Sequence, residues 1–162
     1  LMQLCGAIKN KYDNETVMTK PQEILVDVIG LGSGVVDRLS EQNLPVRGVN
    51  VAEAPSTKKN FLNLRAELWF AIKDWLAQRD CRLPNDDELV AELVAPIYKY
   101  TSTGKIKIES KEEMKKRGIK SPDRADALAL TMASAAASFS GSQSFMGYNF
   151  KKPLKSRILR VG

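Results

Sequence analysis

The chain has 162 residues, of which 43% are hydrophobic, and this length and composition predict one compact domain. Lys and Arg number 25 against 19 Asp and Glu, so the net charge is +6, which favours a polyanionic partner such as nucleic acid. The chain contains no histidine, which excludes Ser-His-Asp triads, Cys-His pairs and the usual zinc sites that contain histidine. Any catalysis must therefore use carboxylates, lysines or hydroxyl groups.

Two further features bear on where the protein works. Its two cysteines, Cys5 and Cys81, have no CxxC spacing, which favours a reducing, intracellular setting. No apolar run approaches the roughly 20 residues of a membrane span. The chain begins at Leu1 and not at Met, which suggests an excised part of a longer protein.

The first third of the chain predicts helix, strand, glycine turn, helix and strand. Apolar residues recur at helical spacing over 2–12, and "EILVDVIG" is a β-branched run typical of a buried strand. The turn "GLGSG" follows, and then a short helix, "VVDRLSEQNL", and a second strand, "VRGVNV". This alternation indicates an α/β domain.

The rest of the chain predicts more helices and one hairpin. The strongest helical pattern covers 59–79, with an apolar stripe, and a shorter helix lies near "DDELVAELV". A hairpin is expected at "IYKYTSTGKIKIES", then the charged helix "KEEMKKRG" and a last helix over 122–138. We therefore assign residues 1–139 to the domain, and residues 140–162 to a Gly/Ser linker and a basic tail.

Asp27 lies near the C-terminal end of the first predicted strand, where open α/β sheets place their ligands. A buried carboxylate needs a cation, several backbone donors or a metal. Two interpretations remain open: Asp27 caps the glycine turn through the backbone, or it is a functional carboxylate.

The glycine turn also allows a dinucleotide-binding interpretation. Glu53 falls about 20 residues beyond the turn, where an acid that binds ribose is expected. However, Val35 occupies the position of the third glycine of GxGxxG, and the carboxylate of Asp27 would repel a pyrophosphate. A tight turn followed by a helix is the simpler interpretation.

The segment "SPDRADALAL" places two acids at the start of the last helix. Ser121 is a good N-cap and Pro122 a good first helical residue, and an acid in the first turn favours the helix dipole. Asp123 is explained in this way. Asp126 shares a face with residues 123, 130 and 133, at the margin of the buried stripe, where two acids repel each other unless a divalent cation lies beside them.

A basic segment precedes these acids. It is either a solvated face paired with nearby glutamates or a surface that holds phosphates beside a metal centre. The residues expected to bind DNA are Lys105, Lys107, Lys111, Lys115, Lys116, Arg117 and Lys120.

Several of these stretches occur in the order found in one known family. They include "ILVDVIGLGSGVVDRL", "VRGVNVAEAP", "FLNLRAELWF" and "GKIKIESKEEMKKRGIKSPDRADALAL". Together, from Met2 to Ala137, they resemble the C-terminal nuclease domain of the large terminase subunit of tailed bacteriophages. "DRADALAL" is also similar to the last helix of a Holliday-junction resolvase, another member of the ribonuclease-H-like superfamily.

The resemblance implies a ribonuclease-H-like mixed sheet flanked by helices, and an endonuclease that cuts concatemeric double-stranded DNA with two Mg²⁺ or Mn²⁺ ions. Asp27, Asp123 and Asp126 would bind the ions, with Glu109 as a weaker candidate. The family has a further acid on an earlier strand, which this chain lacks, so we expect a truncated domain whose own activity is in question. No Walker A motif is present, and none of the family's ATPase activity is expected here.

The resemblance also implies partners and a location. These are an N-terminal ATPase domain, the portal protein and the small terminase subunit, in the host bacterial cytoplasm at the procapsid portal, with no membrane. The alternative from another class is a non-catalytic module that binds DNA or the portal. A dinucleotide-binding domain is the third possibility.

Overall fold

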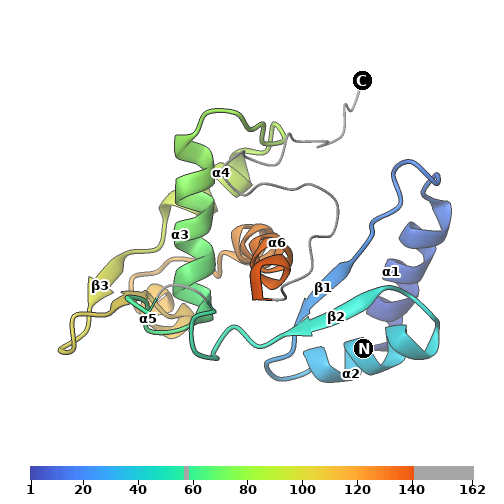
Figure 1. The fold of residues 1–162 in the computed structure, drawn as a ribbon, viewed down its shortest axis with the longest axis horizontal. Helices are drawn as coiled ribbons and strands as arrows, with labels where there is room; N and C mark the ends of the chain where they lie inside the picture. Colours follow the sequence, from blue (N-terminus) through green and yellow to red (C-terminus); the bar gives the residue numbers. More distant parts are fainter. Residues whose placement is uncertain (57–58, 141–162) are drawn as a thin grey trace. The chain divides into compact units, whose positions relative to one another are not determined.

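The computed structural model describes residues 1–56 and 59–140, and the chain forms two compact units. Unit 1 spans Leu1–Ala52, and unit 2 begins at Glu53. The expected linker and basic tail, apart from Ser140, lie outside the described residues. Both units combine helices with a two-stranded sheet (Figure 1), in agreement with the expected mixed α/β class.

Unit 1 consists of two helices and a parallel pair of strands, in the predicted order. Strand pairing runs in register from Ile24 opposite Val46 to Asp27 opposite Val49. The core of the unit contains Cys5, Val35, Leu39 and Leu44. The elements are α1 (Met2–Asn14), β1 (Ile24–Asp27), α2 (Gly32–Glu41) and β2 (Val46–Val49).

Helix α2 begins at Gly32, three residues before the expected start. Gly30 lies within the turn with a φ of 73°, a left-handed conformation that glycine adopts readily. A Cβ atom on Gly32 would lie 1.7 Å from the carbonyl oxygen of Asp27. The chain therefore packs the first turn of α2 directly on the end of β1, and Gly32 is the residue that makes room.

Replacing Gly32 by alanine is expected to destabilise the protein by at least about 2 kcal/mol, because the backbone must shift to relieve the overlap. Urea unfolding followed by circular dichroism measures the effect. The matched control is Gly6→Ala in α1, where a new Cβ meets nothing within 4 Å and a gain of up to about 1 kcal/mol is expected. Equal stability of the two variants would contradict the packing argument.

Unit 2 contains four helices and an antiparallel hairpin among its described residues. Helix α6 packs against α3 and α4 (Figure 1). The bridge between Phe61 and Ile106 joins the hairpin to the chain that leads into α3. The elements are α3 (Leu64–Ala77), α4 (Asp87–Val94), β3 (Tyr98–Tyr100), β4 (Ile106–Ile108), α5 (Lys111–Lys116) and α6 (Asp123–Ser140).

Side-chain caps determine where three of these helices begin. The Asn63 side chain accepts a hydrogen bond from the Ala66 N–H at 3.1 Å, so α3 starts at Leu64 and not near residue 59. Asp86 caps α4 in the same way. Ser110 and Glu113 form a reciprocal capping box at the start of α5.

The buried face of α6 differs from the expected one. Ala125, Ala129 and Ala133 are 0 to 5% exposed, whereas Leu130 is only partly buried and Asp123 is exposed. Small side chains at intervals of four residues allow close approach to the neighbouring helices. The core stripe is therefore centred on these alanines, and Asp126 lies at its margin, as the sequence predicted. No helix within residues 1–56 and 59–140 is long and apolar enough to span a membrane.

A candidate metal and nucleic-acid site

The start of α6 is capped by another helix. The sequence predicted Ser121 as N-cap, but the helix begins at Asp123, and Oε2 of Glu92 in α4 accepts from the N–H of Arg124 at 2.7 Å and of the next residue at 2.9 Å. The Ser121 hydroxyl instead donates to Oδ1 of Asp123 at 2.6 Å. Ser121 therefore orients an acidic side chain and leaves the backbone cap to Glu92.

Asp126 is held by α3. Its Oδ1 accepts from Arg65 Nε at 3.3 Å, Arg65 Nη2 at 3.1 Å and Trp69 Nε1 at 2.9 Å. Arg65 also donates to the backbone oxygen of Glu109 at 2.7 Å, which ties the hairpin end to the same place. The Asp126 side chain is 21% exposed, and hydrogen bonds from Arg65 and Trp69 hold one of its two carboxylate oxygens in place.

Lys111 bridges the two acids. Its Nζ lies 3.3 Å from Oδ1 of Asp123 and 3.4 Å from Oδ2 of Asp126. The hydrogen bond from Ser121, and then the ammonium group of Lys111, lower the pKa of the Asp123 carboxyl, which favours its ionised form. The sequence predicts a divalent cation that relieves the repulsion between the two acids, but Lys111 and Arg65 already compensate their charges.

The donor set nevertheless suits a hard divalent cation. Among the described residues, Oδ2 of Asp126 has only Lys111 as a partner, and Asp123 has only Lys111 and Ser121. Carboxylate oxygens are the ligands that Mg²⁺ and Mn²⁺ prefer, and an ion there would displace the Lys111 ammonium. Within the described ranges, no group of three or more His, Cys, Asp or Glu side chains is close enough to hold a metal.

Asp27 belongs to unit 1, whereas the two α6 acids belong to unit 2. It ends β1, and its Oδ1 accepts from the N–H of Ile29 at 3.0 Å. This is the backbone cap of the glycine turn that the sequence left open, and it uses one of the two carboxylate oxygens. Metal binding by Asp27 remains a prediction.

The features that suggested a dinucleotide have a simpler structural cause. Gly32 is required by its contact with the Asp27 carbonyl, whatever ligand is bound. Strand β2 ends at Val49, and Glu53 is an exposed residue of unit 2 whose backbone oxygen accepts from Leu64. The glycine spacing thus has a packing explanation that needs no nucleotide.

Glu109, the weaker candidate ligand, is 3% exposed and fully engaged. Arg117 donates to Oε1 at 2.8 Å and to Oε2 at 2.6 Å, and the N–H of Ile97 donates to Oε2 at 3.2 Å. The bond from Arg117 lowers the pKa of the Glu109 carboxyl despite burial, which raises it. Arg117 also donates to the Ala95 carbonyl at 2.9 Å, so this predicted DNA contact has a structural task.

The predicted DNA-binding lysines follow the hairpin and α5. Lys107 is partly buried and lies opposite Lys99, a residue that the sequence analysis missed. Both approach Glu113, at 3.9 Å for Lys99 and 3.3 Å for Lys107. All the others are exposed: Lys105, Lys111, Lys115, Lys116, Arg117 and Lys120.

Solved structures of one domain resemble the chain. It aligns with the nuclease domain of the large terminase subunit gp2 of bacterial virus Sf6, in a mutant form with manganese and beta-thujaplicinol, at 23% identity and a TM-score of 0.61. The alignment covers 78% of this chain and 67% of that one. The chain has the terminase nuclease fold.

Two further structures of this Sf6 domain agree. A mutant with calcium and the nuclease domain itself each match at 22% identity and a TM-score of 0.55, again over 78% of this chain and 67% of theirs. No family model and no curated protein matches the chain. The terminase nuclease fold confirms the expected fold class. Asp123 and Asp126 lie in the first turn of α6, the last helix of the described residues.

Proposed function

We propose that the chain is the nuclease domain of a phage DNA-packaging terminase large subunit, a metal-dependent endonuclease that cleaves concatemeric double-stranded DNA. The observation that carries this proposal is the Asp123 and Asp126 pair at the start of α6, in a chain with the terminase nuclease fold. The Sf6 structures with manganese and with calcium support a divalent ion as the cofactor.

Each residue of the proposed site has a task. Asp27, Asp123 and Asp126 would bind Mg²⁺ or Mn²⁺, and two such ions supply water activation and charge stabilisation for phosphodiester hydrolysis. Arg65 and Trp69 hold Oδ1 of Asp126, which leaves Oδ2 for the ion.

DNA would be held through its phosphates, with little reading of bases. The proposed contacts beside the acids are the predicted lysines, from Lys105 to Lys120, with Arg117 limited by its bonds to Glu109. In the complete terminase, the proposed partners are an ATPase domain, the portal protein and the small subunit. The proposed place of action is the procapsid portal in the host cytoplasm.

One observation favours a second candidate, a non-catalytic module that binds DNA or the portal. Lys111 and Arg65 already neutralise the two α6 acids, so the pair is stable without a metal. The two candidates differ in whether a divalent ion can displace Lys111 and support cleavage.

The deciding experiment is nicking of supercoiled plasmid with Mn²⁺ by the longest natural form of the protein. Asp27→Asn is expected to reduce nicking at least about 100-fold, because it removes the charge that binds the ion. The amide oxygen of asparagine can still accept from the Ile29 N–H, so the turn is preserved.

The matched control is Asp37→Asn, an exposed aspartate in α2 of the same unit, which is expected to nick like the unaltered protein. DNA binding that needs no metal, together with no cleavage by the unaltered protein, would overturn the nuclease and favour the binding module.

A further inference from the structure

Four aromatic rings form a row from the core of unit 2 to its surface. Phe61 is 2% exposed, and its ring centroid lies 5.1 Å from that of Phe70. Phe70 is 5.5 Å from Tyr98 at an interplanar angle of 84°, and Tyr98 is 6.1 Å from Tyr100 at 80°. These edge-to-face contacts anchor the two hairpin tyrosines to a buried residue.

The outer end of this row is open to solvent. Tyr98 is 52% exposed and Tyr100 is 67% exposed, and both lie on the same face of β3 because residues two apart in a strand share a face. In an edge-to-face pair, the edge of one ring covers only part of one face of the other, so most of the ring surface of Tyr98 and Tyr100 stays available. Rings that are held in place and exposed can stack on a flat ligand with little loss of side-chain entropy.

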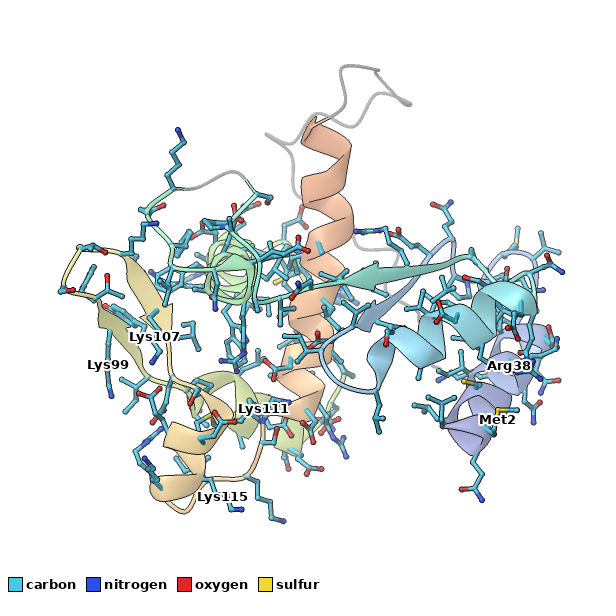
Figure 2. The ribbon with its side chains drawn as sticks, turned by 90° about the horizontal axis from the view of Figure 1, so that it is seen from below. Met2, Arg38, Lys99, Lys107, Lys111 and Lys115 are labelled. Atoms are coloured by element: carbon cyan, nitrogen blue, oxygen red, sulfur yellow. The ribbon has the colours of Figure 1, made fainter. Side chains whose placement is uncertain are left out.

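The charge around these rings selects the ligand. Residues 98–108 contain Lys99, Lys105 and Lys107 and no carboxylate. Lys99 and Lys107 lie directly opposite each other in the hairpin (Figure 2), on the face of the strands away from the tyrosines. This like-charge pair disfavours the sheet unless an anion compensates it, and among the described residues only Glu113 approaches both. On the aromatic side, the Nζ of Lys73 lies 5.2 Å from the centroid of the Phe70 ring.

We propose that the β3–β4 hairpin binds unpaired nucleotides of single-stranded DNA. The bases stack on Tyr98 and Tyr100, and Lys73, beside the ring of Phe70, contacts the phosphates. Duplex DNA is not a suitable ligand for the two tyrosines, because neighbouring base pairs cover the faces of its bases. The inference rests on the proposed nuclease function for the choice of DNA, and it adds the form of DNA that this surface takes.

The test is fluorescence anisotropy with a labelled oligothymidylate of roughly 16 nucleotides and with a duplex of equal length, in EDTA so that nothing is cleaved. Tyr98→Ala and Tyr100→Ala are each expected to weaken single-strand binding about tenfold and duplex binding less than about twofold. Tyr98→Phe and Tyr100→Phe keep the rings and are expected to bind like the unaltered protein.

Salt dependence separates stacking from charge. Lys73→Ala is expected to reduce the slope of log K against log[salt] by about 0.7, the value for one phosphate contact on a single strand, whereas Tyr100→Ala leaves the slope unchanged. The proposal is overturned if oligothymidylate does not bind, if the alanine variants bind it normally, or if single-strand and duplex binding fall equally. Because binding is measured without metal, an inactive nuclease would not alter these results.

Discussion

Asp126→Asn is expected to reduce Mn²⁺-dependent nicking at least about 100-fold while the protein stays folded. Asparagine keeps an oxygen that can accept from Trp69 and Arg65, so the contact between α6 and α3 is retained. It removes the negative charge at Oδ2, where only Lys111 is a partner among the described residues. Plasmid nicking, Mn²⁺ titration calorimetry and the Tm measure the three effects.

Two comparisons make this result specific. Asp126→Ala removes the acceptor as well as the charge. It leaves the Trp69 N–H without this acceptor and the partly buried Arg65 with its bond to the Glu109 backbone oxygen, and it is expected to lower the Tm clearly below that of Asp126→Asn. Asp74→Asn on α3 is a charge-matched control for nicking. Undiminished nicking by Asp126→Asn would remove this residue from the proposed metal site.

Arg117→Ala is expected to destabilise unit 2, lowering the Tm by roughly 10 °C. It leaves the Glu109 carboxylate, 3% exposed, with the Ile97 N–H as its one remaining donor among the described residues. It also removes the donor to the Ala95 carbonyl. Thermal unfolding followed by circular dichroism measures the loss.

The pH dependence gives this prediction a sign. Arg117 lowers the pKa of Glu109, so the pair stabilises the fold above the carboxyl's unfolded pKa, and this contribution disappears as the pH falls through the lowered pKa. The difference in Tm between the unaltered protein and Arg117→Ala should therefore shrink toward pH 3. Lys116→Ala, an exposed neighbour in α5, is the control and is expected to leave the Tm unchanged. A constant difference at all pH values would contradict the charge argument.

Local patterns predicted most of the elements because their causes are local. Apolar periodicity, the β-branched run that contains Asp27 and the capping residue Ser110 each act within a few positions of the chain. The boundaries that were missed depend on contacts: α2 starts early because Gly32 packs on the Asp27 carbonyl, and α6 is capped by Glu92, 32 residues away. Local patterns in one sequence contain no signal for partners that are distant along the chain.

The sequence by itself determined the order of helices and strands, the likeness to the terminase nuclease and the position of Asp126 at the edge of a buried stripe. Only the tertiary structure decided what surrounds that acid. Arg65 lies 61 residues before it and Lys111 lies on another helix, yet both reach its carboxylate. Charge compensation depends on distance in space, and the fold alone brings these cations within reach of the acids that the sequence had singled out.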